Sequence, residues 1–425
     1  MLTFVKISQM VLVSIGSLLV NPLFWIVIGI TYYMYGKGSD IEERMLGYRI
    51  PLWEKIKNSI LIGLLGGVIG SSLSVFLGIT IEQYTSLESS NFNSGILYIW
   101  IIALLLSLIN VRYLCFSYAG GIVALTNLIF GFPKINPIGI IALVGILHLI
   151  ESLLIWVDGY SNAVPVFLKR KDGNAVGGYI MNRIWPLPML ILFAAIVAGG
   201  VGESISMPDW WPIIRQPGLD INMENFMYIL QPIPVILGYG DVAITKTPAK
   251  RCKDSAWRLA VYSVILIALA AIASKIHLFA YAAAVFAPVG HELLIIYGQK
   301  EEEDGKALFE APERGVKVLF CHKGFPGVKM NLEPGDTIVA INNVRIDKEE
   351  DLSDFLKNYP TYIWLDIVNS YGEKKTLEYK NYERGISSLG ALIVPRSPEL
   401  YLEINKTSKL VKHLKGLWRD KNKKA

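Results

Sequence analysis

Charged residues are scarce in this chain of 425 residues: Asp, Glu, Lys and Arg make up 18% of it, whereas an average soluble domain has about a quarter. The shortage is confined to residues 1–299, which form a series of apolar runs, while the residues that follow have an ordinary soluble composition. The composition therefore predicts a polytopic transmembrane domain over residues 1–299 and a smaller soluble region after it.

The motifs of enzymes and cofactor sites are missing as well. The three cysteines, Cys115, Cys252 and Cys321, lie far apart and have neither the spacing of a disulfide framework nor that of a metal site. The soluble part has no phosphate-binding loop, dinucleotide fingerprint or Ser/His/Asp order. We therefore expect no enzymatic activity, no cofactor and no metal. The net charge of +5 does not indicate nucleic-acid binding, because the basic residues are scattered over loops.

The apolar runs predict eight to ten membrane spans. The candidates are residues 23–34, 60–79, 96–109, 114–132, 138–157, 184–201, 226–238, 259–273 and 278–297, with residues 4–20 as a possible tenth. The run 226–238 is short and contains Pro232 and Pro234, so a broken or re-entrant helix is the alternative there. Basic loops precede the second run, follow the fifth and precede the eighth, and the loops between them are poor in Lys and Arg. The positive-inside rule then puts the chain in the cell membrane with its C-terminal domain in the cytoplasm.

Ionisable side chains inside predicted spans are costly and are functional candidates by default. The candidates are His148, Glu151, Asp241, His291 and Glu292. A site-2-type intramembrane protease needs the motif His-Glu-x-x-His, but His291-Glu292 is followed by Leu-Leu-Ile, so the second histidine is missing. Protease activity is therefore a remote alternative, as is a metal held by His148, Glu151 and His291. Hydrogen bonding between helices is the favoured interpretation.

Residues 305–395 have the pattern of a small sheet domain. A strand over 315–321 is followed by a Pro-Gly turn at 334–335, a second strand, a helix over 348–359 and two further strands. This order, with the segment LEPGDTIVAINN, resembles a bacterial PDZ domain, which binds an extended peptide at an open sheet edge. The predicted fold is an α-helical transmembrane bundle followed by a small α+β PDZ-like domain.

The peptide-binding groove of such a domain needs a helix wall and an edge strand. Leu352, Phe355 and Leu356 share one helix face and are candidates for the wall, although the same spacing suits residues that pack the core. Two stretches could supply the strand, since each places a glycine ahead of apolar residues. The order of a PDZ domain favours the first stretch, and the second stays open. The first is Gly305, Lys306, Ala307, Leu308 and Phe309, and the second is residues 388–395, with Leu389 and Gly390.

The last residues, 396–425, form a basic tail. Leu410, Leu414 and Leu417 recur at helical spacing beside Trp418, with lysines between them. This pattern is typical of a short amphipathic helix on anionic lipid, and equally of a solvated terminus.

Several stretches of the chain resemble the MinJ family, polytopic membrane proteins with one cytoplasmic PDZ domain. They are NPLFW (21–25), LGYGDVAIT (237–245), APVGHELLI (287–295), APERGVKVL (311–319) and LGALIVP (389–395). The resemblance implies a non-enzymatic scaffold that lies in membrane lipid and places the division site. It also implies that a DivIVA-like protein and a MinC–MinD-like inhibitor pair are the partners. The runner-up interpretation is a transporter or channel regulated by its PDZ domain, because His148, Glu151 and Asp241 lie in the predicted membrane domain.

Overall fold

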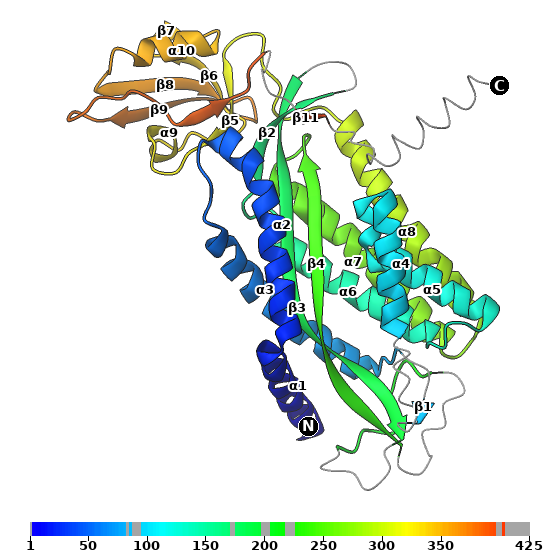
Figure 1. Ribbon diagram of the computed structural model, residues 1–425. Coiled ribbons are helices and arrows are strands. Elements are labelled where there is room, and N and C mark those ends of the chain that lie inside the picture. Colours follow the sequence, from blue (N-terminus) through cyan, green and yellow to red (C-terminus); the bar gives the residue numbers. More distant parts are fainter. Residues whose placement is uncertain are drawn as a thin grey trace, which may run out of the picture.

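The computed structural model describes residues 2–81, 85–86, 95–170, 175–196, 205–216, 226–396 and 402–403. These residues form a long body of helices around a β-hairpin, and a small sheet domain sits at one end of that body (Figure 1). The body consists of α1 (Leu2–Val20), α2 (Pro22–Leu46), α3 (Leu52–Leu77), β1 (Thr85–Ser86), α4 (Gly95–Ile109), η1 (Val111–Leu114), α5 (Phe116–Phe130), α6 (Pro137–Asp158), β2 (Val164–Lys169), β3 (Ala175–Ile196), β4 (Phe226–Ala243), α7 (Pro248–Ala273) and α8 (Leu278–Asp304).

Four of the described helices, α3, α6, α7 and α8, are long and apolar enough to cross a membrane. A fifth span results if α1 and α2, which bend by 68° at Asn21, are taken as one broken span. The described part of the chain therefore suits a multi-pass membrane protein, but with fewer spans than the eight to ten expected. Helices α4 and α5 have 15 residues each and measure only about 22 Å, against a hydrocarbon core of about 30 Å.

The largest departure from expectation is that two predicted spans are strands. Runs 184–201 and 226–238 fall on β3 and β4, which pair antiparallel from Tyr179↔Ala243 to Ile196↔Phe226. Prolines explain the difference, because they break helices and are tolerated in strands only where no ladder N–H is needed. Pro188 lies opposite Pro234 in the ladder, so both missing N–H groups fall on a pair that exchanges no hydrogen bonds. Hydrophobic periodicity cannot separate such a strand from a buried helix.

The second edge of β3 is covered by helices. Backbone N–H groups there meet side chains: Ile184 N donates to the Tyr35 hydroxyl at 3.0 Å, and Leu190 N donates to Ser71 Oγ at 2.9 Å. Pro186 and Pro188 lie between these two residues and face the same edge of the strand, and a proline has no N–H to satisfy. Backbone of this kind is tolerated at membrane depth only where protein surrounds it, and this edge of β3 meets that condition.

Glycines on α3 allow the helix to approach this edge of β3. A Cβ on Gly63 would overlap the carbonyl oxygen of Pro186, and a Cβ on Gly67 would overlap that of Pro188. The two glycines lie four residues apart on one helix face, so they present a smooth stripe to the strand. No side chain larger than hydrogen fits at either position without moving the backbone.

Both unexpected elements are hairpins, α4 with α5 and β3 with β4, and each returns to the end at which it began (Figure 1). The alternation of basic and non-basic loops is therefore preserved although the spans are fewer. Contacts place the basic loops at the end of the body that carries the C-terminal domain: Tyr48 contacts His322, Arg170 donates to the Glu303 carbonyl, and Lys246 pairs with Glu301.

The C-terminal domain is a sheet of order β10-β5-β6-β8-β9, with β7 paired to β6. Its core includes Val318, Ile338, Ile341, Ile363 and Leu365, all fully buried. The expected strands and the expected helix are present, although the helix is shorter than predicted. The elements are β5 (Val316–Cys321), α9 (Pro326–Lys329), β6 (Thr337–Ile341), β7 (Val344–Arg345), α10 (Glu349–Leu356), β8 (Tyr362–Val368), β9 (Lys374–Lys380) and β10 (Ala391–Ile393).

The predicted amphipathic tail, residues 396–425, lies outside the described residues except for Arg396 and for β11 (Leu402–Glu403), which pairs parallel with β2.

We predict that Gly63→Ala lowers the stability of the body by at least the 1–3 kcal/mol or so that overpacking typically costs, because the new methyl group overlaps Pro186. The matched control is Gly29→Ala in α2, where a Cβ meets nothing within 4 Å. Thermal unfolding of the full chain in detergent measures both variants. Equal melting temperatures for the two would contradict the α3–β3 packing.

Candidate functional site

The candidate polar residues of the membrane domain fall into separate places. His148 on α6 and His291 on α8 come together, and Glu292 lies beside them at the tip of the α4–α5 hairpin. Asp241 lies apart, at the end of β4 next to α7. Glu151 lies one turn beyond His148 on α6 and is half-buried. The three residues that motivate the transporter alternative, His148, Glu151 and Asp241, therefore do not form one group.

Glu292 holds the tip of the α4–α5 hairpin. Arg112 of η1 donates to Glu292 Oε1 at 2.5 Å, and the Tyr118 hydroxyl donates to Oε2 at 2.6 Å. Both carboxylate oxygens are thus engaged by the hairpin. The ion pair fastens the tip of two helices that are too short to cross the membrane separately.

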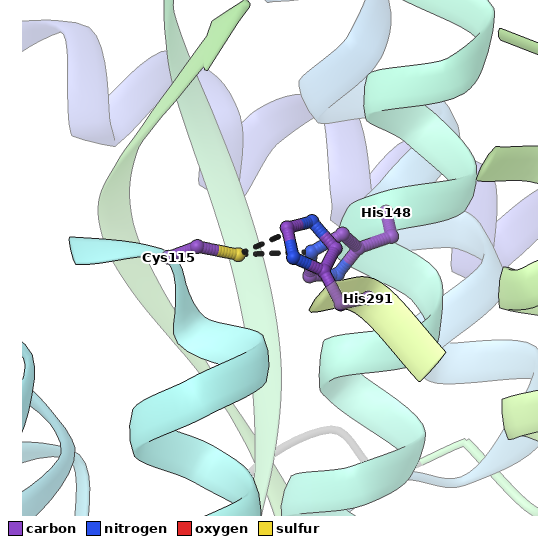
Figure 2. A group of neighbouring side chains, drawn as sticks. All are labelled: Cys115, His148 and His291. Carbon is purple, nitrogen blue, oxygen red and sulfur yellow. Dashed lines mark hydrogen bonds between the residues drawn. The ribbon is translucent and has the colours of Figure 1, made fainter. Parts of the chain in front are cut away.

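Cys115, which has no metal-site spacing in the sequence, joins the two histidines. Cys115 Sγ lies 3.1 Å from His148 Nε2 and 3.8 Å from His291 Nε2 (Figure 2). His148 lies 33 positions after Cys115, and His291 lies 176 positions after it. No local spacing in the sequence could therefore have indicated the cluster. Only the packing of the hairpin tip against α6 and α8 brings them together.

Asp241 has a structural role. Its carboxylate accepts hydrogen bonds from Arg251 Nε at 2.9 Å, from the Tyr239 hydroxyl at 3.0 Å and from Ser255 Oγ at 3.1 Å. A half-buried carboxylate with three donors is satisfied, and Asp241 ties the end of β4 to α7.

The first proposed groove strand, residues 305–309, is used for another purpose. Ala307 and Phe309 are 6% and 0% exposed, and they pack into the membrane body. Gly177 N of β3 donates to the Phe309 carbonyl at 2.7 Å, and Leu308 N donates to the Ile244 carbonyl at 2.9 Å. The prediction of a groove strand at Gly305, Lys306, Ala307, Leu308 and Phe309 is therefore wrong, because docking to the body consumes its apolar side chains and its backbone groups.

This docking holds the C-terminal domain against the body. Phe309 shares one hydrophobic cluster with Tyr179 of β3 and with Leu319 and Val394 of the domain. The Tyr179 hydroxyl also donates to the Leu319 carbonyl. Burial lowers the pKa of Lys317 beside this interface, and the neighbouring Lys306 lowers it further.

The second proposed stretch forms the edge of the sheet. Its strand β10 pairs antiparallel with β5 on one side, and no described strand pairs with the other. Gly390 precedes β10 at a φ of +66°, and a Cβ there would overlap Phe325, so only glycine fits. Leu389 is buried in the domain core. Burial raises the pKa of Cys321, opposite Ala391 in the ladder, to about 12, so this thiol stays protonated.

A cavity of about 610 Å³ lies beside the end of β10. Leu392 and Ile393 line one side, Lys348 and Glu350 at the start of α10 line another, and Arg44 at the end of α2 closes it from the body. The part of α10 that borders this cavity is therefore its first turn. Leu352 and Leu356, proposed for this wall, are core residues, and Phe355 packs partly against the same core.

Comparison with known proteins identifies relatives of the whole chain, although no family model matches it. The cell division topological determinant MinJ of Bacillus subtilis (strain 168) is 23% identical over 399 residues, covering 90% of this chain and 94% of that protein. The probable cell division topological determinant MinJ of Lacticaseibacillus paracasei is 22% identical over 389 residues, covering 89% of this chain and 98% of that protein. The chain is similar to MinJ along nearly its whole length.

The similarity to MinJ extends into the C-terminal domain, because 90% of the chain is more than the membrane body alone can supply. The resemblance to MinJ inferred from short stretches of sequence is thus confirmed as a similarity that covers 90% of the chain.

We predict that Phe309→Ala weakens the docking of the C-terminal domain by about 3–5 kcal/mol, since it removes a fully buried aromatic ring. Limited proteolysis of the full chain should then cut residues 305–315 faster than in the wild type. Tyr371→Ala, at a site that is 89% exposed, is the control and should leave the cleavage rate unchanged. An unchanged rate in Phe309→Ala would show that this contact does not hold the domain.

Proposed function

We propose that this protein is a non-enzymatic determinant of division-site position, which lies in the cell membrane and holds partner proteins there through its C-terminal domain. The observation that carries the proposal is the similarity to MinJ over 90% of the chain, since those relatives are named as cell division topological determinants. A membrane-embedded determinant acts through the proteins it recruits, and this chain has a domain suited to recruitment.

The edge strand β10 supports binding by strand addition, as in PDZ domains. An edge strand offers unpaired backbone groups to an extended peptide, and nearby pockets select its side chains. Here the apolar Leu392 and Ile393 and the charged first turn of α10 border the same cavity. The groove of the domain is thus the space beside β10, and its ligand is an extended segment of a partner protein.

The basic loops support a cytoplasmic position for the C-terminal domain. Residues near Arg49, Arg170 and Lys246 all contact the domain or the adjoining end of α8, and basic loops stay on the cytoplasmic side of the membrane. A cytoplasmic domain docked on the body presents its groove at a fixed distance from the lipid. DivIVA-like and MinC–MinD-like proteins are the partners that the resemblance suggests.

We predict that a fluorescent fusion of the full chain gathers at the division septum and the poles, and that deletion of the gene lengthens the cells. Microscopy of living cells measures both. Uniform fluorescence around the membrane together with normal cell length would contradict a role in division-site placement.

We also predict that partners contact the cavity beside β10. A photo-crosslinking residue in place of Glu350, which lines the cavity, should capture a partner in intact cells. The same residue in place of the exposed Tyr371 is the control, because Tyr371 lies on the β8–β9 turn away from the cavity. If the two positions yield the same products, the groove beside β10 is not the binding site.

A further inference from the structure

The cluster of Cys115, His148 and His291 has the composition of a transition-metal site. One atom from each residue, Sγ or a ring nitrogen, lies within 4.8 Å of the other two. The residues come from three elements, the start of α5, the middle of α6 and the middle of α8, and their side chains point toward one another (Figure 2). His148 is 2% exposed, and the other two are half-buried.

The outer nitrogens of both imidazoles are fixed by hydrogen bonds. His148 Nδ1 lies 2.7 Å from the Val144 carbonyl, so Nδ1 carries the proton and Nε2 presents a lone pair. His291 Nδ1 lies 3.4 Å from the Tyr118 hydroxyl, whose own proton goes to Glu292. That hydroxyl therefore accepts from Nδ1 of His291, and Nε2 of this ring is also unprotonated. Metal-binding histidines typically have such partners on the nitrogen opposite the metal.

A hydrogen-bonded cluster without metal leaves one of these lone pairs without a donor. The Cys115 thiol has one proton to donate, and two Nε2 atoms face its sulfur at 3.1 and 3.8 Å. No other donor to His291 Nε2 occurs among the residues that the structure describes. A metal ion bound by the thiolate and both imidazoles would satisfy all three atoms together.

The two sulfur–nitrogen distances suit a tetrahedral ion. Bonds of about 2.3 Å to sulfur and about 2.0 Å to nitrogen place sulfur and nitrogen ligands about 3.5 Å apart, which lies between the two observed separations. Cys115 also sits at the N-terminus of α5, where Ser117 N donates to its sulfur at 3.4 Å.

We propose that Cys115, His148 and His291 bind a divalent transition-metal ion, with Zn²⁺ the ion that this donor set suits best. Thiolate and imidazole ligands exclude the hard cations Mg²⁺ and Ca²⁺. The ion fastens the tip of the α4–α5 hairpin to α6 and α8, beside the Arg112–Glu292 ion pair. This role is independent of the groove in the C-terminal domain.

The test is titration of the full chain, purified in detergent with a histidine-free tag and stripped of metal, with Co²⁺ as a spectroscopic probe. We expect one ion per chain, a thiolate-to-cobalt charge-transfer band, and displacement of cobalt by Zn²⁺. Cys115→Ser should abolish the band, and His148→Ala and His291→Ala should each weaken binding at least 100-fold. Cys252→Ser and His277→Ala, outside the cluster, are the matched controls and should bind as the wild type does.

A milder variant protects the test against loss of folding. Tyr118→Phe removes the hydroxyl beside His291 and should weaken cobalt binding by about 10- to 100-fold. Normal elution of this variant on size exclusion shows that it is folded, so that its cobalt affinity can be compared with that of the wild type. Zinc should also raise the melting temperature of the wild type and leave that of Cys115→Ser unchanged. Failure of the wild type to bind cobalt one-to-one, or a charge-transfer band that persists in Cys115→Ser, would overturn the proposal.

Discussion

The backbone of β3 has to be satisfied without water, and much of the membrane body is arranged around that requirement. A strand presents two rows of N–H and C=O groups. β4 takes one row along the apolar part of β3. In the other row, two N–H groups donate to the hydroxyl groups of Tyr35 and Ser71, and the prolines between them carry no N–H. A glycine stripe on α3 lets that helix pack directly against this edge of the strand. These separate features of the sequence answer one physical constraint.

The same strand connects the membrane body to the C-terminal domain. β3 has 22 residues and spans about 70 Å, so it reaches beyond the hydrocarbon core. Its first residues, Gly177 and Tyr179, hold Phe309 and Leu319. The domain that supplies the proposed groove is thus fastened to an element anchored deep in the body. The helices α4 and α5 are too short to span the hydrocarbon core, and polar side chains fasten the tip of their hairpin to α6 and α8.

The composition and the loop charges predicted the multi-pass body and a boundary near residue 300, and the pattern of strands and turns predicted the sheet domain after it. They failed for residues 184–201 and 226–238, where the apolar pattern is that of a helix and of a doubly buried strand alike. Pro232 and Pro234 pointed to an irregular segment, but only the pairing of β3 with β4 shows that both runs are strands. Each wrong element is a hairpin, so the alternation of loops on which the orientation prediction rests is unchanged.

At the candidate sites the sequence indicated several of the functional residues but not which of them lie together. It identified Gly390, His148 and His291, since a glycine before an apolar strand and a histidine in a span are local features. It could not place Cys115 beside the histidines or choose between the two groove strands, because those outcomes depend on contacts between distant segments. The sequence by itself determined which parts of the chain avoid water and which glycines and prolines restrict the backbone. The tertiary structure alone decided which buried polar groups meet, since burial compels each of them to find a partner wherever the fold supplies one.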